Sequence, residues 1–515
     1  MVDLIGWSHP HQCARQSMVF EESDLKLIND DQKVFAIDLR SLAALRICLA
    51  LIVLFVVFSQ FSSLELLYTD DGILPRTLNN EYLDAAVSQS GSRHWSLYWM
   101  NGSFGSAQTL LVLTALAAGM MLLGIQSRLA TLACLVLLWS LQVRNPLVLT
   151  AGDILLRMLL FWSVFLPTGS IWTINLSNTA RRPKRWNIVS MASAAIMLQV
   201  AYMYFFSGIS KWNDFWLSGS AVEYSMNLEM YVTPLGAMLS DYPALLKIAT
   251  FLTLLAEIIF PLMLFIPRIT TFNRGFAMGV FWLMHLGIWL TMSIGIFSIT
   301  AICAWIVFIP SEQWNAMLGE PVGFREQRSS RVKPGSLIVN TVSGLFLLYI
   351  TLQNLSNAGI WPANNLQLQR FGQATMTIQK FQMFDRPLTI SPWFEYVGEL
   401  ETGEKVDLFY LPHDQFGIKP DSVYRYMQSQ SWRRIHSNLI TNEASPPNLA
   451  ESHRKIRKRL LMQMVETWND KYPNRKVKNA ELICNLEPIQ FEIDGQAKTT
   501  REVWATYEHL DFSKP

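Results

Sequence analysis

Ionisable side chains stand inside long apolar stretches of this sequence, where a charge is costly. Asp153 and Arg157 lie four residues apart in one stretch, Glu257 precedes Pro261 in a second, and His285 lies in the middle of a third. Because a bilayer disfavours charge, such residues are expected to pair with one another or to serve a function. The spacing of Asp153 and Arg157 places them one turn apart on one helix face, where they can neutralise each other. An ion pair that fixes helix packing explains this spacing at least as well as a catalytic role does.

Lys211 stands just past the end of another apolar stretch and begins the run Lys211-Trp212-Asn213-Asp214-Phe215-Trp216. Removal from water favours the neutral form of a lysine, and a neutral amine can act as a base. The alternative is a lysine that anchors the helix end by extending its amine to the membrane surface, and position alone favours this alternative. For Glu257 and His285, the sequence alone favours packing roles, as a neutral or paired carboxylate and a hydrogen-bonded imidazole.

The composition indicates a membrane protein. Apolar residues make up 51% of the 515 residues and charged residues 16%, whereas soluble domains carry roughly 25% charged residues. The formal net charge is +2 and no basic patch is interleaved with aromatic residues, so nucleic acid is not expected as a partner. The first 40 residues do not have the pattern of a cleaved signal peptide, so the first hydrophobic helix is expected to direct insertion.

Nine windows are long and apolar enough, or nearly so, to cross a hydrocarbon layer about 30 Å thick. The third and eighth windows are short, which leaves the number of spans open by one or two. The windows run approximately over residues 41–62, 107–125, 128–143, 148–167, 188–207, 244–266, 275–292, 296–310 and 337–355.

The distribution of Lys and Arg between the loops predicts the orientation, because cytoplasmic loops carry an excess of them. With the N-terminus inside, eleven basic residues fall in cytoplasmic loops and four in the opposite short loops. The cytoplasmic set is Arg128, Arg181, Arg182, Lys184, Arg185, Arg268, Arg274, Arg325, Arg328, Arg331 and Lys333, and the opposite set is Arg76, Arg93, Arg144 and Lys211. Nine spans then place the residues from about 356 on outside the cytoplasm.

The sequence after the last window changes to alternating and amphipathic patterns. Phe394 to Leu408 alternates around a hairpin turn at residues 401–404, a charged amphipathic helix runs roughly from residue 449 to 469, and a mixed β segment covers about 482–493. The predicted fold is therefore a polytopic α-helical membrane protein with about nine membrane helices and a C-terminal extracytoplasmic α+β domain. Its parts are a cytoplasmic N-terminal segment (1–40), a transmembrane domain (41–355) and the soluble domain (356–515).

The five cysteines are scattered without a CxxC pair or a zinc-type spacing, so neither a structural metal nor a disulfide framework is expected.

An ordered set of motifs carries a family resemblance. The set comprises Asp38-Leu39-Arg40-Ser41-Leu42-Ala43, Tyr68-Thr69-Asp70-Asp71-Gly72-Ile73-Leu74-Pro75-Arg76, Arg144-Asn145-Pro146-Leu147 with Gly152-Asp153 and Arg157, Phe206-Ser207-Gly208-Ile209-Ser210-Lys211, Glu223-Tyr224, His285 and Ser293-Ile294-Gly295-Ile296-Phe297. Together they resemble the HTTM family of membrane proteins, whose best-known member is the vitamin K-dependent gamma-carboxylase. The resemblance covers about residues 35–315. The tail, with Met383-Phe384-Asp385-Arg386-Pro387 and Gly403-Glu404-Lys405-Val406-Asp407-Leu408, looks like that of bacterial members.

The resemblance implies a chemistry and a set of site residues. In the carboxylase, a lysine just past a membrane helix deprotonates a reduced quinone, whose reaction with oxygen gives a strong base and finally an epoxide. The base removes a γ-proton from a peptide glutamate, which takes up carbon dioxide. Lys211 matches that lysine and His285 matches a histidine of the quinone pocket. The remaining residues implied to bind quinone or substrate are Arg144, Asn145, Asp153, Arg157, Trp212, Trp216, Glu223 and Tyr224.

The resemblance departs at Asp153, where the carboxylase has a histidine that supports catalysis. An aspartate cannot serve as the same neutral donor unless it is protonated, so quinol oxidation is implied more firmly than carboxylation. The cofactor expected is a reduced vitamin K-type quinone, with oxygen and carbon dioxide as co-substrates and no metal. The expected partners are membrane lipid, quinone and a peptide or secreted protein substrate, in the inner or plasma membrane if the protein is bacterial.

Two other functions remain open on the sequence alone. One is a non-catalytic HTTM scaffold, and the other is a maturation factor for a secreted peptide. If the enzyme reading is right, the polar groups around Asp153, Arg157 and His285 are expected to converge on one cavity, because each needs a partner in a medium of low dielectric constant.

Overall fold

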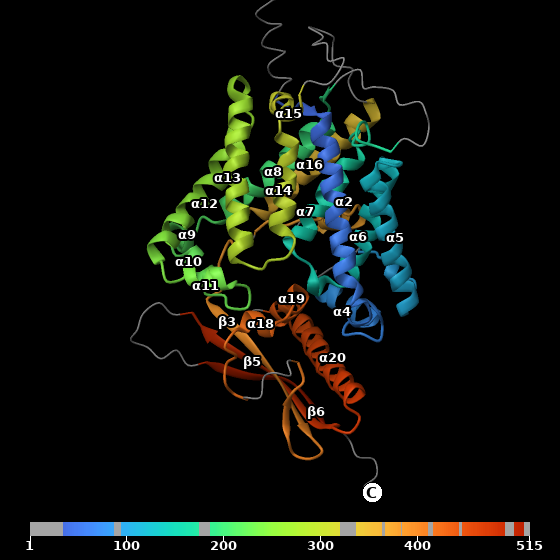
Figure 1. The fold of residues 1–515 in the computed structure, drawn as a ribbon, viewed down its shortest axis with the longest axis vertical. Coiled ribbons are helices and arrows are strands. Elements are labelled where there is room, and N and C mark those ends of the chain that lie inside the picture. The colour runs from blue at the N-terminus through green and yellow to red at the C-terminus, as the bar shows by residue number, and fades with distance from the viewer. Residues whose placement is uncertain are drawn as a thin grey trace, which may run out of the picture.

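The computed structural model describes residues 34–86, 94–174, 186–319, 336–362, 366–382, 384–409, 416–441, 445–489 and 499–508. Long helices form a bundle, and a sheet with its own helices lies against one end of that bundle (Figure 1). The basic clusters predicted at residues 181–185 and 325–333 lie outside the described residues.

Each of the nine apolar windows contains a helix of the bundle. Within the described residues, six helices are long and apolar enough to cross a membrane: α2 (Leu39–Phe61), α5 (Phe104–Leu123), α6 (Ser127–Arg144), α8 (Met191–Ser210), α12 (Pro243–Met263) and α16 (Leu337–Asn357). The other three windows contain α7 (Ala151–Val164), α13 (Thr270–Thr291) and α14 (Phe297–Ala304), which η4 (Trp305–Phe308) continues. The chain is thus a polytopic helical membrane protein, and the number of nine spans stays a prediction.

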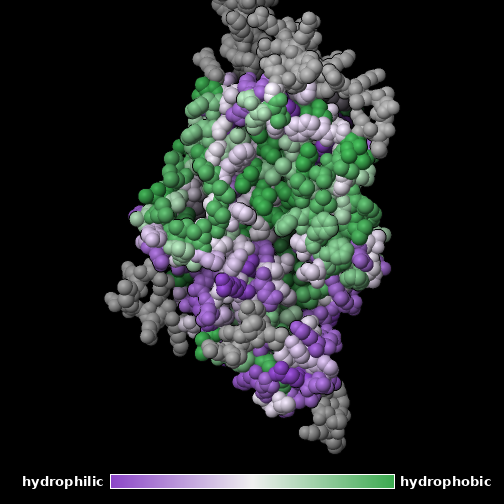
Figure 2. Space-filling model, viewed as in Figure 1, coloured by the Kyte–Doolittle hydropathy of each residue, from purple (hydrophilic) through white to green (hydrophobic). Residues whose placement is uncertain are grey.

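The outer face of the bundle supports this assignment. Figure 2 shows a broad hydrophobic band over the long helices, with hydrophilic residues gathered toward the sheet. The exposed apolar side chains on these helices include Leu116, Leu252 and Leu283. A soluble protein rarely exposes so large an apolar area, and lipid would cover it.

Short helices complete the bundle. They are α3 (Leu64–Tyr68), α4 (Arg76–Ala86), η1 (Leu97–Trp99), η2 (Pro146–Val148), α9 (Asp214–Leu217), α10 (Ala221–Met226), α11 (Pro234–Leu239), η3 (Pro267–Ile269) and α15 (Ser311–Leu318). Two short strands, β1 (Ile37–Asp38) and β2 (Asn187–Ile188), pair antiparallel.

The tail begins with α17 (Leu366–Ala374) and contains one antiparallel sheet in the order β4-β3-β5-β6. Its strands are β3 (Ile390–Leu400), β4 (Lys405–Asp407), β5 (Val477–Pro488) and β6 (Thr500–Glu508), and its helices are α18 (Val423–Tyr426), α19 (Gln430–Leu439) and α20 (Pro447–Lys471).

Two elements predicted for the tail are confirmed and one is displaced. The hairpin turn joins β3 to β4, with Gly403 at a φ of +84° and the Leu400 N–H donating to the Glu404 carbonyl at 2.9 Å. The amphipathic helix is α20. The β segment predicted to begin near Leu482 begins earlier, at Val477, because its first residues pair with the end of β3.

Candidate active site in the membrane domain

A buried ion pair joins α8 to α12. Lys211, the residue that ends α8, donates from Nζ to Glu257 Oε2 at 2.7 Å and to Ser207 Oγ at 2.5 Å. Only 2% of the Lys211 surface is exposed. The sequence-based expectation of a lysine that reaches the membrane surface is therefore wrong, while the expectation of a paired Glu257 is confirmed.

Gly208 lets α8 and α12 come close enough for this ion pair to form. A Cβ atom placed on Gly208 would lie 2.9 Å from Ile258 Cγ1 and 3.2 Å from the Glu257 backbone. The absence of a side chain therefore lets α8 approach α12 closely, one turn before Lys211. The Phe206–Lys211 segment thus supplies both the amine and the close contact that it needs.

His285 on α13 is held by a short hydrogen-bonded chain. Trp305 Nε1 donates to the Tyr204 hydroxyl at 3.0 Å, and that hydroxyl lies 2.6 Å from His285 Nε2. The Trp305 N–H and the Tyr204 hydroxyl both find acceptors when Tyr204 donates to Nε2, and the ring proton then lies on Nδ1. Nδ1 is buried and has no hydrogen-bond partner among the described residues. One donor of the ring is thus left for another molecule.

Lys211 and His285 line the same cavity, of about 100 Å³. Its lining combines polar groups with apolar side chains, among which methionine is frequent. The complete lining is Met203, Tyr204, Ser207, Lys211, Trp216, Val222, Ser225, Met226, Thr253, Glu257, Met284, His285, Ile288, Met292, Phe297 and Phe384. We call this the Lys–His cavity.

Trp216 closes one side of the Lys–His cavity. The Lys211 ammonium lies 5.1 Å from the centre of its indole ring, and its Nε1 donates to the Phe384 carbonyl at 2.8 Å. Trp212 is different, since 69% of its surface is exposed and it lines none of the cavities described here. Glu223 and Tyr224 also lie outside the lining, although their neighbours Val222 and Ser225 belong to it.

Asp153 and Arg157 do not form the predicted ion pair. Asp153 caps α7: its carboxylate accepts hydrogen bonds from the Thr150 N–H at 2.8 Å and the Thr150 hydroxyl at 2.6 Å. Arg157 donates instead to Gln142 Oε1 at 2.6 Å and to the Ile378 carbonyl. Neither residue lines the Lys–His cavity, so the predicted convergence is wrong for both and holds only for His285 with Lys211.

Arg144 and Asn145 hold backbone in place. Arg144 donates to the carbonyls of Leu74 at 2.6 Å and Thr69 at 2.7 Å, and Asn145 donates to the carbonyl of Leu67 at 2.9 Å. Both are fully buried. Their contacts fix the loop before α4 and do not reach the Lys–His cavity.

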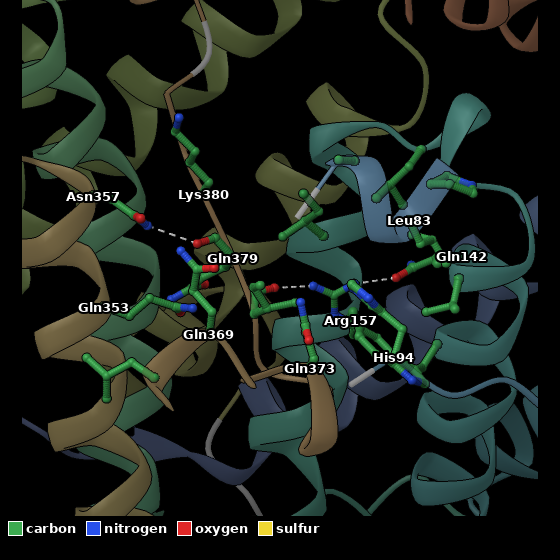
Figure 3. A pocket seen from close by; sticks show the side chains of 18 of the residues that line it. Leu83, His94, Gln142, Arg157, Gln353, Asn357, Gln369, Gln373, Gln379 and Lys380 are labelled. Carbon is green, nitrogen blue, oxygen red and sulfur yellow. Dashed lines mark hydrogen bonds between the residues drawn. The ribbon is translucent and has the colours of Figure 1, made fainter. Parts of the chain in front are cut away.

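A second cavity, of about 670 Å³, lies between α6, α7, α16 and α17 (Figure 3). Carboxamides dominate its polar wall, with the cations Arg157 and Lys380 beside them, and no acidic side chain of the described residues lines it. The labelled polar residues are His94, Gln142, Arg157, Gln353, Asn357, Gln369, Gln373, Gln379 and Lys380. We call it the carboxamide cavity.

A third cavity, of about 840 Å³, lies between the bundle and the tail and is lined by residues of both. It shares Pro146, Leu149, Ile154 and Lys380 with the carboxamide cavity, and Met292, Phe297 and Phe384 with the Lys–His cavity. This boundary cavity therefore adjoins both of the others, and the three lie in series.

The contribution of the tail to these cavities was not predicted from the sequence. Residues 378–388 supply Ile378, Gln379 and Lys380 to the carboxamide cavity, several residues to the boundary cavity, and Phe384 to the Lys–His cavity. The described residues of this segment have no regular secondary structure, so no periodic pattern could have marked it. Met383, part of a tail motif, lies outside the described residues.

A family model described as the HTTM domain matches residues 36–314, which is more than half of the chain. The matched region contains Lys211, Glu257 and His285 and ends before the tail. No curated protein and no solved structure matches the chain.

Proposed function

This chain belongs to the HTTM family, and we propose that it is an enzyme of the vitamin K-dependent carboxylase type, which uses a reduced quinone and oxygen at the Lys–His cavity. The reaction would modify a peptide or protein, and glutamate carboxylation is the modification that the family suggests.

The observation that carries the proposal is a proton-accepting pair and an imidazole donor on one apolar cavity. Lys211 Nζ and Glu257 Oε2 are 2.7 Å apart, so a neutral Lys211 amine can take up a proton beside the Glu257 carboxylate, which stabilises the ammonium that forms. His285 lines the same cavity, and its Nδ1 has no hydrogen-bond partner among the described residues. A general base and a hydrogen-bond donor on one cavity are what deprotonation of a phenolic hydroxyl requires.

When bound, a reduced quinone would supply the electrons that reduce oxygen, one atom of which enters the epoxide while the other leaves as water. The protein residues have simpler tasks. Lys211 takes the proton from a hydroxyl of the molecule in the cavity, and the Glu257 carboxylate balances the positive charge that results. His285 donates to an oxygen atom, and Tyr204 and Trp305 hold its ring in place. The apolar walls exclude water, which strengthens each of these electrostatic contacts.

The side chains that line the cavity suit an aromatic ring with oxygen substituents, but the cavity is small for such a ring. Ligand pockets usually measure about 300–1,000 Å³, against about 100 Å³ here. Four methionines line the cavity: Met203, Met226, Met284 and Met292. Because methionine side chains are unbranched and adapt easily, their rotation would open space toward the boundary cavity.

The other two cavities fit the proposed peptide substrate. The boundary cavity has three cationic side chains, Lys380, Arg386 and Arg434, against the single carboxylate of Asp385. In the carboxamide cavity, the Arg157 guanidinium is buried and its Nε has no hydrogen-bond partner among the described residues. Carboxamides can both donate to and accept from peptide backbone. An acidic peptide bound here would pass its side chain toward Phe297 and the Lys–His cavity.

The test is epoxide formation by purified protein in lipid, supplied with reduced vitamin K and oxygen and followed by chromatography. Epoxide that depends on Lys211 supports the proposal. Incorporation of labelled carbon dioxide into a glutamate-containing peptide would extend it to carboxylation.

One observation favours the alternative of a non-catalytic scaffold or maturation factor: the Lys–His cavity is small and tightly packed. Absence of epoxide from a folded, lipid-embedded protein would favour that alternative.

A further inference from the structure

Two cysteines from different helices meet inside the bundle. The side chains of Cys48 on α2 and Cys303 on α14 interact with each other. Both are free thiols, and both are half-buried. They are 255 residues apart in sequence (303 minus 48) and belong to no spaced motif, which is why the sequence did not predict them as a pair.

The register of the two helices accounts for this meeting. The Ser41 hydroxyl on α2 donates to the Ile309 carbonyl at 3.0 Å, just past the end of η4. Cys48 lies seven residues further along α2, a rise of about 10 Å at 1.5 Å per residue. Cys303 lies six residues before Ile309 on the antiparallel α14–η4 segment, again about 10 Å away. The two thiols therefore reach the same depth, and α2 and α14 pack together there (Figure 1).

This depth isolates the thiols from water-soluble redox buffers. Cys48 is nine residues from the first residue of α2, or about 14 Å, which is near the middle of a hydrocarbon layer about 30 Å thick. The helix itself is long and apolar enough to span the membrane. Glutathione does not enter such a layer, so the rule that links disulfides to compartments does not govern this pair. Only a lipid-soluble reactant can exchange electrons with it.

Cys303 lies on a helix that also forms the Lys–His cavity. Phe297, on the same α14, packs edge-on against the His285 ring with their centres 5.3 Å apart. Trp305, two residues after Cys303, donates to Tyr204. A covalent bond at Cys303 would thus fix the wall that positions His285.

We propose that Cys48 and Cys303 are a two-electron redox pair that forms an S–S bond between α2 and α14 by reducing a membrane quinone. Two S–H bonds break and one S–S bond forms, while two electrons and two protons pass to the quinone and give the quinol. Because the two thiols are neighbours, the S–H of one can stabilise a thiolate that forms on the other. The proposal does not depend on the function assigned to Lys211.

The experiment uses the full chain in lipid nanodiscs, reduced and then freed of reductant. Decylubiquinone is added without oxygen, because its ring is fully substituted and cannot form a thioether with cysteine. Free thiols are then counted after denaturation by maleimide mass-tagging, and quinol is measured by absorbance. We expect the count to fall from five, the number of cysteines in the chain, to three, with one quinol formed per protein and a linked Cys48–Cys303 peptide in the digest.

Cys48→Ser and Cys303→Ser should each abolish both changes, whereas Cys134→Ser, which alters a buried cysteine on α6, should leave the loss of two thiols and the quinol yield intact. The linked peptide decides the question in the unmodified protein even if a serine variant fails to fold. An unchanged thiol count, or a disulfide that forms only with copper phenanthroline and without quinol, would overturn the proposal.

Discussion

Removal of Lys211 changes stability and chemistry together, so a single alanine variant cannot assign its role. Lys211→Ala leaves Glu257 buried without its partner at 2.7 Å. Breaking a buried ion pair by deleting one side costs about 3–5 kcal/mol. This is a large part of the 5–15 kcal/mol that typically stabilises a protein. A lysine at the membrane surface would have caused only a small loss.

A double variant separates the two effects. Lys211→Met with Glu257→Gln removes both charges and keeps similar volumes, and replacement of a buried pair in this way is often neutral or stabilising. We expect it to unfold near the temperature of the unmodified protein, as measured by intrinsic fluorescence, while its rate of epoxide formation falls by about 10²–10⁴-fold, the usual contribution of a general base. Lys211→Arg keeps a positive charge beside Glu257 but cannot accept a proton, so it should also be inactive.

Epoxide formation at the full rate by the double variant or by a folded Lys211→Arg protein would refute the role of Lys211 as the base. A double variant as unstable as Lys211→Ala would contradict the structural role of the ion pair. Because the two roles have different readouts, one can fail without the other.

Three further predictions concern other parts of the chain. Arg157→Met should raise the KM for an acidic peptide by tenfold or more and leave kcat with free quinol nearly unchanged; an unchanged KM would remove Arg157 from peptide binding. Burial lowers the pKa of His436 to about 4, while the hydrogen bond to the Trp432 carbonyl acts in the opposite sense. The unfolded state therefore binds more protons than the folded state between pH 6.5 and 4. As the pH is lowered through this window, the free energy of unfolding should fall by up to about 3 kcal/mol. His436→Gln should flatten that part of the stability profile, and an equal slope in both proteins would contradict the assignment. Reporter fusions at residues 183 and 400 should lie on opposite sides of the membrane, and the same sidedness would refute the charge-based topology.

The sequence predicted the parts of the fold that depend on local pattern. Each apolar window contains a helix, and the turn around Gly403 and the amphipathic α20 are where periodicity placed them. Asp153 shows how one local pattern can hide another. Its spacing to Arg157 suggested an ion pair, but Thr150 stands three residues before it, which is the spacing of a capping box. Had that signal been weighed, the cap on α7 would have been predictable.

The pairing of Lys211 with Glu257 was not predictable in the same way. The two residues are 46 positions apart on different helices, and hydrophobic windows do not state which helices pack together. Gly208 gives a partial signal, because a residue without a side chain one turn before a lysine permits a close helix contact. The contact partner itself emerges only from the packed bundle. This is also why Lys211 was expected at the membrane surface, since a position at a helix end does not show what covers that end.

The tail covers the C-terminal end of α8, and it contacts the bundle mainly through backbone carbonyl groups. Trp216 Nε1 donates to the Phe384 carbonyl at 2.8 Å, Asn213 donates to the Asp385 carbonyl at 2.7 Å, and Arg157 donates to the Ile378 carbonyl. Each donor is a side chain of the bundle, and leaving such a donor buried and unsatisfied costs about 1–3 kcal/mol. The bundle therefore depends on the tail to satisfy its own polar groups, and the tail segment forms a wall of each cavity in the series. A ligand that moves this segment would change the Lys–His cavity directly, so binding at the boundary between bundle and tail would be coupled to the chemistry that we propose at Lys211.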